Sequence, residues 1–147
     1  MSQPEISIFL PEQVKAQHMR ELIAEILGAR GEPLRMIDFF HDDCIFHVIG
    51  TSHDYSFSGD YYGRDQILGL LRRIDTDIEM QDHRILNVVI DGDTVGLRRS
   101  TMVRHRGTSA RARLLVGNFV RLRDDRIAEI SEYVDTCWLK RMLGEDE

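Results

Sequence analysis

The sequence predicts an α+β fold in which N-terminal helices cover the concave face of a curved antiparallel sheet. Apolar residues recur at helical spacing in three segments before residue 75, and from residue 84 the period changes to two. Residues 114–135 then form a predicted long hairpin, the last part of a four-strand meander. Strands of about ten residues in a meander usually curl. We therefore expect a cone-shaped sheet that encloses a pocket beneath the helices.

Three helices are predicted in the first half of the chain. Residues 11–28 form the first, because Pro11 suits a first turn and Gly28 suits an end. Its core face consists of Met19, Leu22, Ile23 and Ile26. The others are predicted at 33–40 and 63–74.

The remaining elements follow from apolar runs and turn signals. Residues 44–49 form a strand that is apolar on both sides, and 50–62 form a loop. Asp-Gly-Asp at 91–93 is typical of a hairpin turn. The further predictions are strands at 85–90 and 94–105, a turn at 106–110, a closing helix at 136–143 and a loose acidic end at 144–147.

The hairpin register predicts a buried polar pair. A three-residue loop at 124–126 opposes Asn118 to Glu132 on an otherwise apolar face. A two-residue loop would instead oppose Val120 to Glu129, which pairs an apolar residue with a charged one. The remaining predicted pairs are Leu122 with Ala128, Val120 with Ile130, Val116 with Val134, Arg121 with Glu129 and Gly117 with Tyr133.

A third polar residue joins this row from the preceding strand. In 94–105 the odd positions form the core face, and Arg99 is their exception. A four-residue loop at 107–110 would oppose Arg99 to Asn118, whereas a two-residue slip would make Arg99 a diagonal neighbour. The predicted lining of the ligand pocket around this row is Phe46, Val48, Leu97, Thr101, Val116, Val120, Ile130, Val134 and Trp138.

Two interpretations of the polar row remain open. In the functional one, Glu132 is a general base or acid, while Arg99 and Asn118 orient a polar ligand group or water. In the structural one, the row is a satisfied buried ion pair with an amide neighbour. Burial raises the pKa of a carboxylate and a guanidinium lowers it, and the sequence does not say which dominates.

Composition limits the classes of function. The 147 residues indicate a single domain spanning 1–147, and a net charge of −6 argues against general nucleic-acid binding. The chain contains no apolar run long enough for a membrane span. Cys44 and Cys137 form no framework or metal spacing, which favours a cytoplasmic setting without a metal or cofactor.

The arginines between 98 and 126 suggest a protein interface instead. Leu115, Phe119 and Met102 share the convex face with several of them. An apolar centre surrounded by arginines suits a homodimer interface better than a nucleic-acid groove. The arginines concerned are Arg98, Arg104, Arg111, Arg113, Arg121 and Arg123.

Three motifs resemble the SnoaL-like and ketosteroid-isomerase-like proteins of the nuclear-transport-factor-two-like superfamily. They are residues 40–46 (FHDDCIF), Gly59 with 62–67 (YGRDQI), and 126–135 (RIAEISEYVD). The resemblance covers most of the chain and implies a cone with an internal pocket, in many members a dimer through the convex sheet face.

The resemblance implies only part of a catalytic set. The isomerase's general base falls on Val48, its protonated-Asp donor falls near Asn118, and its catalytic Tyr has no counterpart. Limonene epoxide hydrolase is similar at Arg99 and Glu132, but Thr101 stands in place of an acid. In SnoaL-type cyclases an Asp near the end of the last strand is the acid/base, which makes Asp135 a second candidate.

Two function classes result. The first is a cofactor-independent enzyme, an isomerase, cyclase or hydrolase, acting by acid/base chemistry on a small, largely apolar substrate. The second is a non-catalytic ligand-binding or dimerisation module on the same fold. An enzyme needs Glu132 to be reachable from a pocket. In a module, Phe46, Val48, Leu97 and Trp138 could fill that space.

Overall fold

The computed structural model describes residues 11–50 and 56–144. Predictions for 1–10, for 51–55 of the loop and for 145–147 of the acidic end lie outside the described residues. The helices are α1 (Pro11–Gly28), α2 (Pro33–Met36), the 3-10 helix η1 (Ile37–Phe39), α3 (Gly63–Asp77) and α4 (Thr136–Met142). The strands are β1 (Phe40–Val48), β2 (Gly59–Tyr62), β3 (Ile78–Asp91), β4 (Thr94–His105), β5 (Arg111–Arg123) and β6 (Arg126–Val134).

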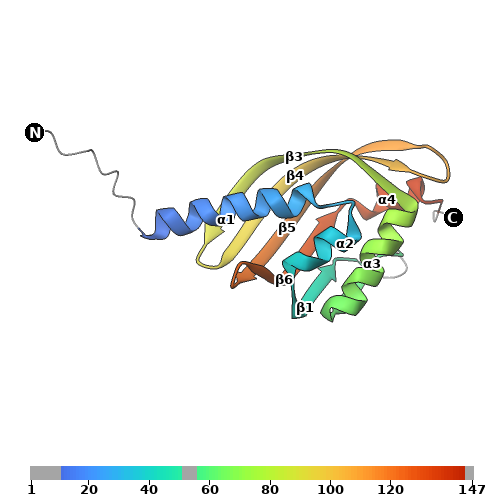
Figure 1. Cartoon of the computed structure of the whole chain (residues 1–147). Helices are drawn as coiled ribbons and strands as arrows, with labels where there is room; N and C mark the ends of the chain where they lie inside the picture. The colour runs from blue at the N-terminus through green and yellow to red at the C-terminus, as the bar shows by residue number, and fades with distance from the viewer. Residues whose placement is uncertain (1–10, 51–55, 145–147) are drawn as a thin grey trace, which may run out of the picture.

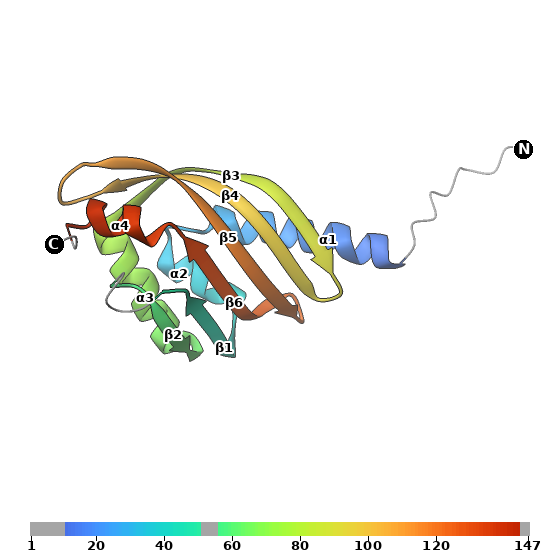
Figure 2. The ribbon, with the colours of Figure 1, turned by 180° about the vertical axis from the view of Figure 1, so that it is seen from behind.

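The strands form one curved six-stranded sheet in the order β2-β1-β6-β5-β4-β3. The four-strand meander β3 to β6 is antiparallel, as predicted. The sheet as a whole is mixed, because β1 runs parallel to β6. Helices α1, α2 and α3 lie against one face of the sheet, and α1 projects beyond it at one end (Figures 1 and 2). The predicted α+β architecture is therefore confirmed.

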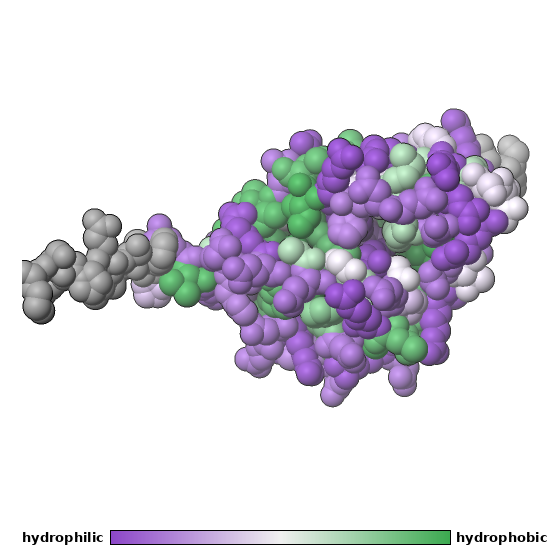
Figure 3. All heavy atoms as spheres, turned by 45° about the horizontal axis from the view of Figure 1, so that its top comes forward, coloured by the Kyte–Doolittle hydropathy of each residue, from purple (hydrophilic) through white to green (hydrophobic). Residues whose placement is uncertain are grey.

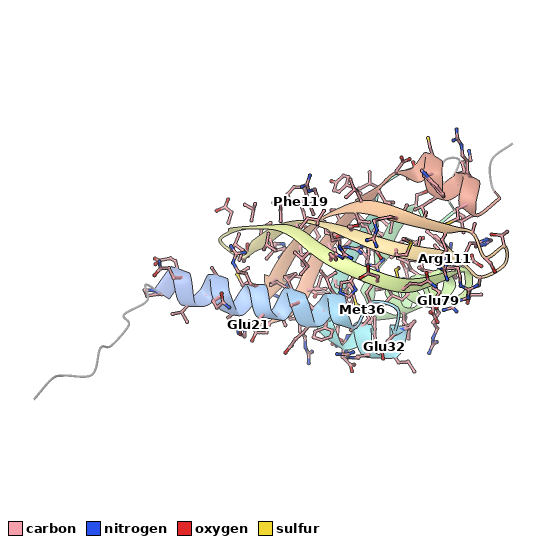
Figure 4. All side chains as sticks on the ribbon, turned by 90° about the horizontal axis from the view of Figure 1, so that it is seen from above. Glu21, Glu32, Met36, Glu79, Arg111 and Phe119 are labelled. Atoms are coloured by element: carbon pink, nitrogen blue, oxygen red, sulfur yellow. The ribbon has the colours of Figure 1, made fainter. Side chains whose placement is uncertain are left out.

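Alternation along the strands separates a buried concave face from an exposed convex face. In β5 the even positions are buried and most odd positions are exposed. In β4 the odd positions Val95, Leu97, Arg99, Thr101 and Val103 are buried. Figure 4 shows Met36 beneath the sheet, on the side of α1, and Phe119 on the other side. The core lies between the concave face and the helices.

Several predicted boundaries are wrong in ways that have physical causes. Phe40 opens β1 instead of ending a helix, and its side chain is fully buried. The short strand β2 lies within the predicted loop, because its pairing with β1 makes it a strand despite its polar sequence. β3 begins at Ile78, seven residues before the predicted strand.

The β5–β6 hairpin reaches the predicted register by a different route. Its turn has two residues, Asp124 and Asp125, both with positive φ (50° and 61°), which is the geometry of a tight hairpin turn. Leu122 pairs with Ile127, and a bulge at Ala128 then restores the predicted pairs from Arg121 with Glu129 onward. The predicted three-residue loop and the Leu122–Ala128 pair are wrong, but Asn118 does oppose Glu132.

Candidate functional site

Glu132 lies on the concave face of β6, where its side chain is only 9% exposed. Strand alternation puts it there, since its neighbour Tyr133 points to the exposed face. The amide of Asn118, directly opposite on β5, donates to Oε1 of Glu132 at 3.3 Å. The predicted adjacency of these two residues is therefore present inside the sheet.

Arg99 reaches the pair from β4, although its predicted register is wrong. Arg99 opposes Val116, and Leu97 opposes Asn118, a shift of two residues from the prediction. The cause is the turn: His105 pairs with Ala110, so the loop begins one residue earlier than predicted. The long side chain spans the diagonal, with Nε 2.9 Å from Asn118 Oδ1 and Nη2 2.8 Å from Glu132 Oε1.

A second guanidinium completes the cluster. Arg30 follows α1 and forms a bidentate salt bridge with Glu132, in which Nη1 donates to Oε1 at 3.0 Å and Nη2 donates to Oε2 at 3.1 Å. Such pairs fix both the position and the orientation of a carboxylate. Arg30 is not among the predicted site residues, because the predicted helix ends at Gly28. The core row of α1 would have pointed to it, since residue 30 follows Ile26 by one turn.

We call Arg30, Arg99, Asn118 and Glu132 the concave cluster. It combines two positive charges with one negative charge in a buried setting, which leaves an excess of positive charge. Burial alone would raise the pKa of Glu132, but the charges of Arg30 and Arg99 and the hydrogen bonds outweigh it and bring the pKa to about 2. Glu132 is therefore ionised at neutral pH, and in this arrangement it is a weak base.

A cavity of about 30 Å³ adjoins the cluster. This is room for water molecules and far less than the roughly 300–1,000 Å³ of ordinary ligand pockets. Its polar lining consists of Arg30, Arg99, Thr101 and Glu132, and Thr101 is occupied in donating to the Asp82 carbonyl at 3.0 Å. The apolar lining is Ile74, Ile78, Met80, Val103, Leu114, Val116, Val134 and Leu139.

The predicted lining residues divide between this cavity, a neighbouring one and the core. Thr101, Val116 and Val134 line the 30 Å³ cavity. Leu97, Val120 and Ile130 line a second cavity of about 10 Å³ on the other side of Arg30. Phe46 and Val48 are buried in the hydrophobic core.

Two predicted residues lie elsewhere. Trp138 is 44% exposed on α4, and its neighbour Leu139 faces the cavity instead, because the helix turns only one of them inward. Asp135 is exposed at the start of α4, where its carboxylate accepts from the Trp138 amide at 3.1 Å. This carboxylate caps a helix and takes no part in the concave cluster.

The convex arginines are largely paired with carboxylates. Arg104 bonds to Glu79 at 2.7 Å, Arg113 to Asp82 at 3.0 Å and Arg123 to Asp43 at 2.7 Å.

Within residues 11–50 and 56–144, no group of three or more His, Cys, Asp or Glu side chains has a metal-binding arrangement. In the same residues no helix has the length and apolar character needed to cross a membrane.

Known proteins share this fold at low sequence identity. A protein with a ketosteroid-isomerase-like fold from Catenulispora acidiphila, solved with trimethylamine, has a TM-score of 0.71 at 20% identity over 84% of this chain and 92% of its own. A nuclear-transport-factor-two-like protein from Burkholderia xenovorans has a TM-score of 0.72 at 19% identity, covering 86% and 96%. A limonene-epoxide-hydrolase-like epoxide hydrolase from M. tuberculosis has 0.66 at 18%, covering 85% and 88%.

Sequence comparison assigns the family. No curated protein matches the chain in sequence. The SnoaL-like domain matches residues 19–130, which include α1 from Met19 onward, α2, α3 and the sheet as far as Ile130 of β6. The match confirms the expected family: the chain belongs to the SnoaL-like proteins, and its fold is similar to that of nuclear-transport-factor-two-like proteins.

Proposed function

We propose that this protein is a cofactor-independent enzyme that performs acid/base chemistry on a small, largely apolar substrate bound at the concave face. One observation carries the proposal: an ionised carboxylate and two guanidiniums lie on the wall of a cavity whose other walls are mostly apolar. Such a combination of apolar walls and a few convergent polar groups is typical of ligand sites. The epoxide hydrolase and ketosteroid-isomerase-like relatives are similar in fold.

Each polar residue has a role that its position supports. Glu132 is the proton acceptor, and Arg99 stabilises negative charge that develops on a substrate oxygen. Within the described residues, Nη1 of Arg99 takes part in no side-chain hydrogen bond, so this donor is available to the cavity. Asn118 holds both partners in place through its bonds to Arg99 and Glu132.

The lining favours isomerisation or cyclisation over epoxide opening. Among the described residues that line the cavity, Glu132 is the one carboxylate. By the resemblance to limonene epoxide hydrolase, Thr101 stands in place of the acid that would protonate an epoxide oxygen. A threonine hydroxyl does not supply that proton readily. Proton transfer between carbon positions needs one base and one charge-stabilising donor, which Glu132 and Arg99 provide.

A panel of apolar ligands tests the proposal. Thermal shifts are measured for the wild type, for Glu132→Gln and for Glu129→Gln, a control on the same strand whose side chain is 40% exposed. Ligands should stabilise all three proteins, while any turnover should be lost in Glu132→Gln alone. Turnover that survives in Glu132→Gln would refute acid/base chemistry at this residue.

A non-catalytic ligand-binding or dimerisation module is the second candidate. Its support is the fully paired state of Glu132 together with a cavity of only about 30 Å³. Ligand-dependent stabilisation without turnover of any panel member would favour this alternative.

The two free cysteines, Cys44 and Cys137, fit a reducing compartment, and we propose the cytoplasm for either function.

We also propose a homodimer through the convex face. The support is a group of exposed apolar side chains from three strands: Val89 at 67%, Leu115 at 61%, Phe119 at 59% and Tyr133 at 45% exposed. A hydrophobic area is visible on the body near the end from which α1 projects (Figure 3). Exposed apolar patches of this kind are typical of protein interfaces.

A further inference from the structure

Three separate cavities on the concave side share a single side chain, Arg30. The 30 Å³ cavity lies between the concave cluster and α3. A cavity of about 10 Å³ lies toward α2 and Leu71. The cavity of about 10 Å³ that Leu97, Val120 and Ile130 line lies toward α1 and Ile127. Arg30 lines all three, while Ile74, Ile78 and Met80 also line the first two and Met36 also lines the two smaller ones.

The backbone of Arg30 lies close to solvent while its side chain is buried. Arg30 belongs to the short connection between α1 and α2, whose next residues, Gly31 and Glu32, are exposed. Gly31 has φ of +94°, a conformation that favours glycine. The Arg30 side chain is nevertheless only 7% exposed. A change in its rotamers, without movement of either helix, would carry the guanidinium from the core to the surface.

Within the described residues, the Arg30 guanidinium is held by Glu132 alone. Its two side-chain hydrogen bonds go to the two oxygens of that carboxylate. Arg99, in contrast, is fixed by Glu132 and Asn118 together and is 2% exposed. One partner therefore decides whether Arg30 stays inside, and any group that replaces Arg30 on Glu132 releases it.

We propose that Arg30 is a displaceable gate: an entering ligand takes its place on Glu132, and the three cavities become one chamber. The inference rests on the proposed function in placing the ligand at the concave face. It adds the chemical class of the ligand, which is an apolar body carrying a hydrogen-bond donor, an ammonium or a hydroxyl group, at the end that meets Glu132.

The need for a donor follows from the bonds that remain. When Arg30 leaves, Oε1 of Glu132 keeps Arg99 and Asn118, but Oε2 loses the one side-chain partner that it has among the described residues. A buried carboxylate oxygen without a donor costs free energy, which a ligand N–H or O–H recovers. A ligand carboxylate in the same place would face Oε2 with a like charge and would be excluded.

Displacement of Arg30 also changes the basicity of the Glu132 carboxylate. The charged groups that face Glu132 are Arg30 from the α1–α2 connection and Arg99 from β4, while β5 contributes the neutral Asn118. From α3, Asp75 lines the adjoining cavity but is paired with Arg106 at 3.2 Å. With a neutral hydroxyl ligand, the loss of one of the two cations lets burial raise the pKa of Glu132, so the carboxylate becomes a stronger base, whereas an ammonium ligand replaces the lost charge.

The test compares Arg30→Met with Arg35→Met, a control in α2 whose side chain is 56% exposed. Binding of three probes with the same ring, benzylamine, benzyl alcohol and benzoate, is measured by calorimetry. We expect Arg30→Met to bind benzylamine and benzyl alcohol at least about tenfold more tightly than the wild type, because these probes no longer displace a paired cation. The control should match the wild type, and benzoate should gain nothing.

Two results would overturn the gate. One is equal affinity of Arg30→Met and wild type for both donor probes. The other is that the wild type binds benzoate more tightly than the two donor probes and that Arg30→Met loses this affinity. Arg30 would then be a fixed partner for an anionic ligand. If Arg30→Met fails to fold, Arg30→Gln replaces the guanidinium with a neutral side chain that can still donate a hydrogen bond, and Arg99 continues to balance the charge of Glu132. Arg30→Gln should still bind benzyl alcohol more tightly than the wild type, and equal binding would reject the proposal.

Failure of the gate and failure of the enzyme proposal are distinguishable. Turnover that persists in Glu132→Gln rejects the chemistry and leaves the probe affinities of Arg30→Met as they are. Unchanged probe affinities in Arg30→Met reject the gate, while loss of turnover in Glu132→Gln would still support the chemistry.

Discussion

Glu132 is the residue on which the concave site depends. In the part of the chain that the structure describes, its carboxylate accepts four side-chain hydrogen bonds, two from Arg30 and one each from Arg99 and Asn118. A buried ion pair is weak support for stability by itself, because both ions lose their hydration. Removal of one partner is costly nevertheless, since the remaining charges stay buried without compensation.

Neutralising Glu132 should therefore destabilise the protein strongly. Glu132→Gln leaves Arg30 and Arg99 as two buried cations beside each other, and we expect a loss of about 3–5 kcal/mol in urea unfolding. The control Glu129→Gln removes a half-exposed carboxylate from the same strand and should cost roughly 0–1 kcal/mol. Equal losses for the two variants would show that Glu132 is not held in a buried, paired cluster.

The same carboxylate predicts an acid limb in the stability profile. The pKa of Glu132 is lowered from 4.5 to about 2, so the unfolded chain binds a proton at higher pH than the folded one. Its contribution is fully present above the unfolded value and is lost as pH falls toward the folded value. Urea midpoints of wild type and Glu132→Gln should therefore converge between about pH 4.5 and 2. A gap that stays constant over this range would contradict the low pKa.

At this scale the sequence predicts three of the four members of the concave cluster. Strand alternation alone brings Arg99, Asn118 and Glu132 to one face, and the length of Arg99 compensates for the error in its register. Arg30 is not predicted because it lies beyond the end of α1 at Gly28, where the helical period no longer assigns a face. Whether burial or positive charge controls Glu132 depends on that fourth residue, which is why its ionisation could not be predicted.

Among the elements, the hairpin β5–β6 shows how a correct register can follow from a wrong loop. The turn is one residue shorter than predicted, and a bulge at Ala128 supplies the missing residue. The two effects cancel beyond Arg121, so the apolar pattern is satisfied in either arrangement. In the hairpin β4–β5 nothing cancels the one-residue shift of the turn, and the register differs by two.

A row of alternating charges ties the edge strand β2 to the sheet. His47 of β1 bonds to Asp60 of β2 at 2.7 Å and to Glu129 of β6 at 2.9 Å. Arg121 of β5 extends the row, 3.8 Å from Glu129. The hydrogen bonds to Asp60 and Glu129 raise the pKa of His47 above its ordinary value of 6.5.

This row predicts a stability component that is lost at alkaline pH. Because the folded pKa of His47 is raised, its contribution is complete below pH 6.5 and disappears as pH rises through the folded value. The gap in urea midpoint between wild type and His47→Gln should thus be larger at about pH 6 than at about pH 9. His83→Gln, on β3, is the control. A gap that grows with pH would mean that His47 is not held as a cation.

On the scale of the whole molecule, the convex face is the least covered surface. Phe119 is 59% exposed, meets the ring of Tyr133 edge-on at 6.2 Å and lies over Gly96, where an added Cβ would stand 3.3 Å from it. The two rings therefore form an exposed edge-to-face pair on the convex face. Aromatic residues are enriched at the centres of interfaces.

A charge placed at this patch should dissociate the proposed dimer. Light scattering at two concentrations should give twice the chain mass for the wild type and the single chain mass for Phe119→Arg. Val14→Arg, at an exposed apolar position of α1 (56% exposed), is the matched control and should remain dimeric. A wild type that is monomeric at both concentrations would remove the dimer proposal.

The overall architecture was more predictable than its edges. The helical period of α1 and α3 and the alternation of β4 to β6 determine the cone, because each pattern fits one buried face. β2 and the first half of β3 were missed, since edge strands have few buried positions and show little alternation. The parallel pairing of β1 with β6 depends on contacts between distant segments, and no local pattern specifies it.

The most direct test of the central claim follows the concave cluster during ligand binding. The Arg99 Nε–H and the Asn118 side-chain amide are observed by NMR while the most stabilising ligand of the panel is added. If the concave cluster is the ligand site, these signals shift with saturation, together with those of Val116 and Leu139, which line the cavity. Shifts confined to convex residues such as Phe119, with the Arg99 and Asn118 signals unchanged, would contradict it.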